Sequence, residues 1–345
     1  MVEFPEKFDS EEELDDFISE PSDQLIDLCR NWKGPTVVFG IAGKMGYHLG
    51  MMLVKARDRS GSSGEIIGVS RFSDSEARRK VEEAGIRTVA ADLLSPDAAA
   101  GLPDAQRVVY MVGRKFGTAG SEELTWAVNT LIPQAVCRRY AGIPIVVYST
   151  GAVYPRVPLE SGGADESLPL TPLGEYANAA VGRERIFQYM SGVTGTPICL
   201  VRLFYAIDLR YGVLRDIGEK VASGETVDLN MGYVNVIWQG DAVNQSLLAF
   251  SQCAIPPRPL NVTGPEIISI RDTAERFAEL LGRRAKFSGT PATDALLGKT
   301  DRTVGLFGPP RVSVEKMIVW VAEWIKAGGR GLNKPTHFET RNGDY

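Results

Sequence analysis

The sequence has few of the residues that build metal centres, and it lacks long apolar runs. Only two histidines and four cysteines occur in 345 residues, and the cysteines are scattered without a C-x-x-C pair, so we expect no metal site. No apolar run reaches the ~18–20 residues of a membrane helix. The acidic start also lacks the apolar segment of a secretory signal. We therefore expect a cytoplasmic protein with reduced thiols and no membrane partner.

Basic charge is not in excess either. The net charge is −5, which argues against a nucleic-acid partner because nucleic-acid surfaces on proteins are basic. With 44% hydrophobic and 23% charged residues, the composition is that of a folded globular protein. The length is about twice that of one ordinary domain of ~100–200 residues. These properties predict one or two globular domains.

Residues 1–33 are polar and acidic and predict an N-terminal helical extension packed on the main body. Ser10, followed three residues later by Glu13, is typical of a capping box that opens a helix. A second helix is expected at about Gln24–Asn31, where apolar residues recur at helical spacing.

From Thr36 onward, short apolar runs alternate with longer amphipathic segments. The expected strands are Thr36–Phe39, Ile66–Val69, Arg87–Val89, Val108–Val112, Ile145–Tyr148 and Ile198–Val201. The helices expected between them are Gly46–Arg57, Asp74–Ala84, Glu122–Tyr140 and Glu175–Ser191. Such a β-α succession predicts an α/β fold with a doubly wound parallel sheet, the Rossmann fold, over residues 34–204. A sheet of this kind binds ligands at the carboxyl ends of its strands.

After Leu203 the regular alternation of expected strands and helices ends. Residues 205–330 are expected to form mostly a smaller, C-terminal substrate-binding lobe, with strands at 235–238 and 260–262 returning to the sheet. Later helices are expected at Asp241–Ser251, Ile270–Leu281 and Val314–Lys326. Residues 331–345 are expected to be a loosely held polar tail.

A glycine-rich turn follows the first expected strand and opens a helix: Gly40, Gly43, Lys44, Met45 and Gly46 belong to it. Gly40 permits a tight turn, Gly43 lets the backbone approach a pyrophosphate, and Gly46 lets helix and strand pack closely. The helix N-terminus supplies N–H donors and positive potential. This setting predicts a dinucleotide cofactor.

The end of the second expected strand bears on which cofactor binds. An acidic residue there binds the ribose hydroxyls of NAD, but this chain has Ser70 and Arg71. An arginine beside a small hydroxyl suits a 2′-phosphate, so the cofactor is NAD or NADP, with NADP favoured. Asp92 and Leu93 lie after the third strand, where an adenine amino group is expected.

Further stretches follow in a fixed order: Val109–Gly113, Val128–Asn129, Val147–Tyr154, Tyr176, Val201–Tyr205 and Asn261–Gly264. Together with the glycine-rich turn they resemble the extended short-chain dehydrogenase/reductase family, of the NAD-dependent epimerase/dehydratase type, over residues 36–327. The resemblance implies hydride transfer, with Tyr176 as acid/base and Thr150, helped by Ser149, polarising the substrate oxygen. It also implies cofactor contacts from Met111, Val112, Gly113, Asn129, Tyr176, Phe204 and Tyr205. A homodimer through helices 122–140 and 175–191 is expected by the same analogy.

One position departs from the family. A lysine four residues after the tyrosine lowers the phenol pKa of about 10 in family members, and here Ala180 stands there. Arg183 shares a helix face with Tyr176 and leans back toward it, so it is one candidate for the missing charge. Arg183 is otherwise a solvated surface charge. In a second interpretation, Tyr176 and Thr150 remain hydrogen-bonding partners of the substrate while the chemistry is slow or specialised. As a third possibility, the protein is a non-catalytic dinucleotide binder.

Two other departures concern the substrate. Gly151 and Ala152 replace the acidic pair that dehydratases of this family carry, and Val234 stands where nucleotide-sugar enzymes have an arginine. Arg210, Tyr211 and Arg215 remain as candidates for binding an anion. We therefore expect an NAD(P)-dependent oxidoreductase or epimerase-like enzyme of carbohydrate metabolism, acting on a hydroxyl or keto group of a small molecule. The alternative is a sensor or scaffold of the same fold.

Overall fold

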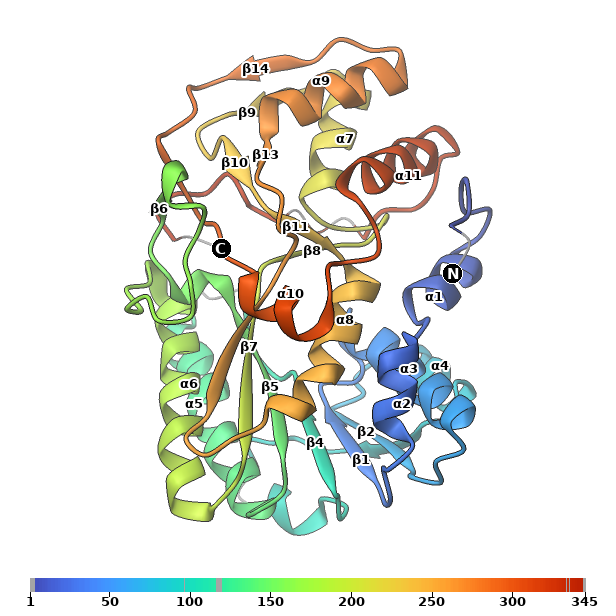
Figure 1. The fold of residues 1–345 in the computed structure, drawn as a ribbon, viewed down its shortest axis with the longest axis vertical. Coiled ribbons are helices and arrows are strands. Elements are labelled where there is room, and N and C mark those ends of the chain that lie inside the picture. Colours follow the sequence, from blue (N-terminus) through green and yellow to red (C-terminus); the bar gives the residue numbers. More distant parts are fainter. Residues whose placement is uncertain (1–3, 96, 116–119, 333, 335, 344–345) are drawn as a thin grey trace.

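A seven-stranded parallel sheet forms the centre of the protein (Figure 1). The computed structural model describes residues 4–95, 97–115, 120–332, 334 and 336–343. The strand order is β12-β7-β5-β4-β1-β2-β3. The strands are β1 (Thr36–Phe39), β2 (Ile66–Ser70), β3 (Arg87–Ala90), β4 (Arg107–Tyr110), β5 (Ile145–Thr150), β7 (Ile198–Leu203) and β12 (Arg258–Val262). The order reverses between β1 and β4, which is where a doubly wound sheet opens a ligand crevice.

Helices cover both faces of the sheet, as its continuous apolar strands require. Val37 and Phe39 pack in the layer of α5 (Glu122–Arg139) and α6 (Gly174–Thr194). Val38, which points the other way, packs in the opposite layer. That layer consists of α2 (Asp23–Cys29), α3 (Gly46–Ser60), α4 (Ser75–Glu83) and α8 (Gln239–Leu248). This is the Rossmann architecture that the sequence predicts.

The N-terminal segment joins the two halves of the molecule. Ser10 caps α1 (Glu11–Ile18), because its Oγ accepts a hydrogen bond from the Glu13 N–H over 3.1 Å. Leu14 of α1 is fully buried in the core of the smaller lobe described below. Leu25 of α2 is fully buried in the helical layer that covers one face of the sheet. The extension is therefore part of both cores.

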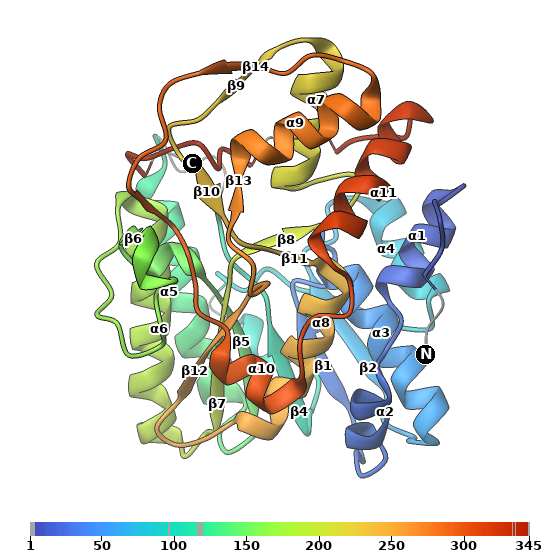
Figure 2. The same cartoon turned by 45° about the horizontal axis from the view of Figure 1, so that its top comes forward.

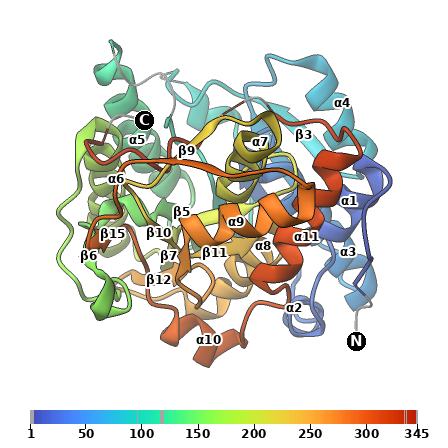
Figure 3. The ribbon, with the colours of Figure 1, turned by 90° about the horizontal axis from the view of Figure 1, so that it is seen from above.

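A smaller lobe lies over the carboxyl ends of the strands (Figures 2 and 3). Its core contains Ile217, Phe277 and Trp320. Its helices are α7 (Val213–Ser223), α9 (Ile270–Leu281) and α11 (Val314–Lys326). Its strand pairs are β9 (Thr226–Asp228) with β14 (Lys286–Ser288), and β10 (Tyr233–Val234) with β13 (Ile268–Ser269).

Other short elements connect the lobes. Strand β6 (Val157–Pro158) pairs with β15 (Asp294–Ala295), and β8 (Tyr205–Ile207) pairs with β11 (Val236–Trp238). Helix α10 (Asp301–Phe307) follows β15. The 3-10 turns are η1 (Ala98–Gly101), η2 (Gly151–Val153), η3 (Leu159–Ser161) and η4 (Ala249–Gln252). Within the described ranges, no helix has the length and apolar character to cross a membrane.

Two expectations about the second half of the chain were wrong. Strand 260–262 joins the central sheet through β12, but strand 235–238 does not, because β11 pairs with β8 in a separate two-stranded sheet. The edge of β7 is already taken by β12, so β11 pairs where the chain continues beyond the sheet. The tail is not loose either: Phe338 is 2% exposed, and Thr336 donates two hydrogen bonds to Asp216.

Candidate active site

Two cavities lie at the carboxyl ends of the strands, and the glycine-rich turn separates them. The first, of about 580 Å³, is lined by Gly40 and Gly43 together with residues after β2, β3 and β4, and is called here the glycine-turn cleft. The second, of about 260 Å³, is lined by Lys44, Met45, Thr150 and Tyr176 among others, and is called the tyrosine pocket. Successive residues of one turn thus face both cavities.

The geometry of the turn explains its glycines. Gly40 has a φ of +84°, a conformation that side chains disfavour. A Cβ on Gly46 would lie 2.5 Å from the Gly40 carbonyl oxygen, and one on Gly43 would lie 3.1 Å from it. Helix α3 begins here with no side-chain cap, and the N–H groups of Gly46 and Tyr47 donate to the Gly43 carbonyl over 3.0 and 3.4 Å. The positive end of the helix dipole still faces the turn. This arrangement fits a pyrophosphate.

Most of the residues predicted to bind the cofactor line the glycine-turn cleft. They are Gly40, Gly43, Ser70, Arg71, Asp92, Leu93, Met111, Val112 and Gly113. Five other predicted residues line the tyrosine pocket: Lys44, Met45, Tyr176, Phe204 and Tyr205. Gly46 is buried at the start of α3, and Asn129 is buried in α5.

The end of β2 carries no carboxylate, as the sequence indicates. Ser70 is the last residue of the strand, and Arg71 is exposed at the cleft. The nearest acidic residue along the chain, Asp74, caps α4 by accepting from the Glu76 N–H over 2.9 Å. Asp92 Oδ1 accepts from the Leu94 N–H over 3.1 Å. Both carboxylates therefore hold local turns.

Arg183 lies behind the cleft rather than in solvent. Its side chain is buried, and Nη1 donates to the Val112 carbonyl over 3.1 Å. A Cβ on Gly113 would lie 2.5 Å from Nη1, so any larger residue there would displace the guanidinium from its present place. Asn129 Oδ1 lies near the same glycine and, among described residues, has no hydrogen-bond partner. An orphaned buried oxygen at this place suits a bound polar group.

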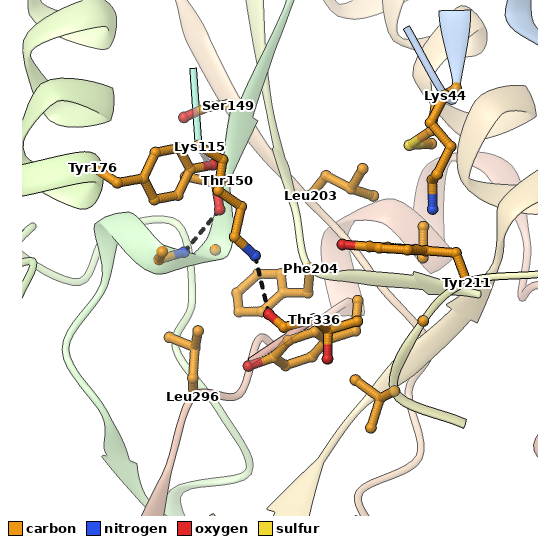
Figure 4. A pocket seen from close by; sticks show the side chains of 17 residues that line it. Lys44, Lys115, Ser149, Thr150, Tyr176, Leu203, Phe204, Tyr211, Leu296 and Thr336 are labelled. Carbon is orange, nitrogen blue, oxygen red and sulfur yellow. Dashed lines mark hydrogen bonds between the residues drawn. The ribbon is translucent and has the colours of Figure 1, made fainter. Parts of the chain in front are cut away.

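The tyrosine pocket brings together Thr150 at the end of β5 and Tyr176 in the first turns of α6 (Figure 4). Thr150 Oγ1 accepts from the Ala152 N–H over 3.2 Å, which leaves its own proton to donate to a ligand. Ser149 lines the same pocket, but its Oγ donates to Glu184 Oε1 over 2.6 Å. Thr150 and Tyr176 are therefore the two hydroxyls best placed for chemistry.

A buried ion pair fixes this arrangement. Glu184 is completely buried and receives two hydrogen bonds from Arg202, of 3.0 and 2.7 Å. Arg202 Nη1 also donates to the Tyr154 hydroxyl over 2.6 Å, and that hydroxyl donates to Asn261 Oδ1 over 2.9 Å. The network links α6 to β7 and β12, so it holds the helix of Tyr176 against the sheet.

The position of the absent lysine is apolar. Ala180 is completely buried in a cluster with Val153 and Phe204. Two other lysines line the tyrosine pocket instead: Lys44 Nζ lies 3.5 Å from the ring centroid of Tyr211, and Lys115 Nζ donates to the Thr336 carbonyl over 3.4 Å (Figure 4). Lys115 and Thr336 were missed from the sequence because irregular loops carry them.

Two of the three candidates for anion binding serve the structure. Arg210 is buried and pairs with Asp208 over 2.9 Å and with Asp15 over 2.7 Å. Arg215 bonds Glu219 and the Gly329 carbonyl. Only Tyr211 of the three lines the tyrosine pocket. Because carboxylates already pair with Arg210 and Arg215, these two side chains hold the structure together.

The fold and site define a dinucleotide-binding α/β protein with a tyrosine and threonine at its second cavity. A family model for the NAD dependent epimerase/dehydratase family matches residues 36–208. The chain belongs to this family, as its resemblance to extended short-chain dehydrogenases/reductases predicts. A search of curated protein sequences finds no match.

Solved structures share the fold at low identity. A UDP-glucuronic acid 4-epimerase from Bacillus cereus, in complex with NAD, is 17% identical with a TM-score of 0.72, over 85% of this chain and 99% of that chain. MoeE5, in complex with UDP-glucose and NAD, is 19% identical with a TM-score of 0.68, over 86% and 99%. A UDP-galactose 4-epimerase is 21% identical with a TM-score of 0.67, over 85% and 99%.

Proposed function

We propose that the protein is an NAD(P)-dependent oxidoreductase or epimerase-like enzyme acting on a hydroxyl or keto group of a carbohydrate-like small molecule. One observation carries the proposal: Tyr176 and Thr150 line a pocket that adjoins a cleft built for a dinucleotide. The bound cofactor would supply a hydride acceptor or donor. The residues of the chain orient the substrate and move its proton.

Each residue then has a role set by its hydrogen bonds. Tyr176 exchanges the proton of the substrate oxygen, and Thr150 donates a hydrogen bond to that oxygen. Ser149, whose proton goes to Glu184, helps to position Thr150. Arg183 supplies positive charge from behind the Val112–Gly113 backbone, on the cofactor side of Tyr176.

Two positions support a substrate other than a nucleotide-sugar dehydratase substrate. Gly151 replaces an acidic residue, and a Cβ there would collide with the Phe204 ring. Val234 is completely buried in the core of the smaller lobe, where it offers nothing to a pyrophosphate. The pocket volume of about 260 Å³ lies just below the ~300–1,000 Å³ usual for ligand sites. A small polyol, sugar acid or keto compound fits these features.

A second function is favoured by Ala180. Because an apolar cluster occupies the place of the usual lysine, a dinucleotide-binding sensor or scaffold without turnover is the alternative. The two functions differ in whether the phenol of Tyr176 is needed for anything that the protein does.

The test compares Tyr176→Phe with Tyr189→Phe, a matched change on the same helix at a side chain that is 70% exposed. We expect NAD and NADP each to raise Tm by mass action in all three proteins. Turnover is followed over a panel of aldoses, polyols and uronic acids, by NAD(P)H absorbance for net oxidation or reduction and by chromatography of the sugars for epimerisation, which leaves no net NAD(P)H. It should fall ~10²–10⁴-fold in Tyr176→Phe only. Unchanged turnover in that variant would exclude the phenol mechanism.

The remaining outcomes also decide between the two functions. Cofactor binding without turnover on any member of the panel would favour the sensor or scaffold. Absence of binding by any form of either cofactor would overturn both.

A further inference from the structure

We propose that the tyrosine pocket takes a small molecule bearing an anionic group, a carboxylate or a phosphate, and that Lys44 and Lys115 hold this group. The inference deepens the proposed function by naming the charge of its substrate. It rests on the proposed function in one respect, that the reaction takes place in the tyrosine pocket.

The two lysines reach the pocket from separate loops. Lys44 belongs to the glycine-rich turn after β1, and Lys115 to the loop after β4. Figure 4 shows the Lys44 amine over the Tyr211 ring and the Lys115 amine beside Phe204 and Thr336. No aspartate or glutamate is among the described residues that line the pocket.

The nearby carboxylates already have other donors. Asp208 accepts hydrogen bonds from Arg210 of 3.0 and 2.9 Å. Asp216 accepts from the Thr336 N–H over 2.8 Å and from its hydroxyl over 2.6 Å. In the part of the chain that the structure describes, no carboxylate oxygen lies within 4.0 Å of Lys44 Nζ, whose close contact is the Tyr211 ring. A substrate anion would therefore complete the charge balance.

The electrostatics of the pocket support the same conclusion. The pKa of Lys44 is lowered to about 7, chiefly by burial; the charge of Asp208 opposes this, and the positive charges of Arg210 and Lys115 add to it. Burial likewise lowers the pKa of Lys115 to about 8. Two ammonium groups in a poorly solvated pocket repel one another, and an anion between them offsets both burial and repulsion.

The rest of the lining fits a small sugar acid or sugar phosphate. Phe204, Tyr211 and Leu296 offer apolar surface for a ring, and Tyr176 and Thr150 offer the hydroxyls for the reacting oxygen. The substrate would thus be held at its charged group by the lysines while its hydroxyl or keto carbon faces Tyr176.

The phosphates of the cofactor are a second kind of anion that a lysine at this place can bind. The glycine-rich turn borders both cavities, so Lys44 could instead serve the pyrophosphate. An experiment must therefore measure the cofactor and the small anion separately.

The experiment measures binding by calorimetry on protein saturated with NAD, using D-glucuronate, glucose 6-phosphate and uncharged D-glucose as probes. We expect millimolar or tighter binding of at least one anionic probe, weakened tenfold or more in both Lys44→Met and Lys115→Met. Lys44→Arg and Lys115→Arg should retain most of the affinity. The control Lys326→Met removes an exposed lysine that pairs with Glu323 and should change nothing.

Several results would overturn the inference. These are no binding of either anion, equal binding of glucose, or a loss of NAD affinity in Lys44→Met and Lys115→Met as large as the loss of anion affinity. The melting temperature of each variant shows that it is folded. Failure of the proposed function is separate, because Tyr176→Phe tests turnover and leaves both lysines in place.

Discussion

One side chain, that of Arg71, bears on whether the protein prefers NAD or NADP. It is exposed beside Ser70 at the edge of the glycine-turn cleft, and its guanidinium can bind a phosphate on the adenosine ribose through paired hydrogen bonds. NAD offers no such phosphate. We therefore propose that selectivity for NADP depends on this one side chain.

Arg71→Ala should weaken NADP binding tenfold or more and leave NAD binding within twofold. Arg79→Ala, at an exposed arginine of α4 that pairs with Glu83 over 3.2 Å, is the control for a general loss of positive charge. Calorimetric titration of each cofactor into the unaltered protein and the two variants gives the six affinities needed. Equal losses of affinity for NAD and NADP in Arg71→Ala would show that Arg71 does not bind the ribose phosphate.

At the residue scale, local chemistry was predictable and contacts between distant loops were not. The glycine positions of the turn follow from backbone geometry alone, so the sequence sufficed for Gly40 and Gly46. Helical spacing also singled out Arg183, yet its guanidinium bonds the Val112 carbonyl. Lys115 gave no signal, because nothing in its own segment tells which cavity a loop side chain will face.

Helix α1 depends on one buried carboxylate. Asp15 is 4% exposed, and its oxygens lie 2.7 Å from His48 Nε2, Arg210 Nη2 and Lys80 Nζ. Burial raises the pKa of this carboxyl, but the hydrogen bond and charge of His48 and the charge of Arg210 outweigh it and hold the pKa well below its usual range. The ionised carboxylate therefore fastens the helix to α3 and the loop after β8.

The lowered pKa of Asp15 sets a pH dependence of stability. The unfolded carboxyl has a pKa of about 3.9, so its stabilising effect is complete above that value and is lost as the pH falls toward the folded value. Asp15→Asn should lower the free energy of unfolding by ~3–5 kcal/mol at pH 7, as for a broken buried ion pair. The difference from the unaltered protein should shrink as the pH falls below 4.

Urea denaturation at a series of pH values measures this effect. Asp16→Asn is the matched control, because Asp16 follows in the same helix with a side chain that is 69% exposed. An exposed pair contributes about 0–1 kcal/mol, so this variant should remain close to the unaltered protein. A constant difference for Asp15→Asn from pH 7 to pH 3 would contradict the argument.

At the scale of elements, prediction succeeded where caps are local and failed where pairing is not. Helices α9 and α11 begin and end where expected, because Ser269 and Ser313 cap their N-termini. The sequence predicted the strand at 235–238, but the prediction that this strand joins the central sheet was wrong. Its apolar residues suit any sheet, and only the occupied edge of β7 decides where they pair.

Helices α5 and α6 present apolar side chains on the outside of the molecule. Leu131 is 57% exposed and Val193 61%, and the two helices lie side by side on one face of the sheet (Figures 1 and 3). Single exposed apolar residues are ordinary, whereas a patch spread over adjacent helices is typical of an interface. We propose that this patch joins two copies of the chain.

Leu131→Glu should convert a dimer into a monomer, because a charge would be buried without a partner in the interface. Light scattering after size-exclusion chromatography should give twice 37.6 kDa for the unaltered protein and 37.6 kDa for the variant. Leu306→Glu, at a leucine on α10 that is 37% exposed, should leave the mass unchanged. A monomeric unaltered protein would refute the interface.

The order in which the chain is synthesised affects the two cavities differently. All described residues that line the glycine-turn cleft precede Pro133, whereas the tyrosine pocket also needs Tyr211, Leu296 and Thr336. A chain still emerging from the ribosome would therefore have made every group for the first cavity while the second still lacked a wall. The lining of the glycine-turn cleft is thus fully synthesised more than 200 residues before Thr336 completes that of the tyrosine pocket.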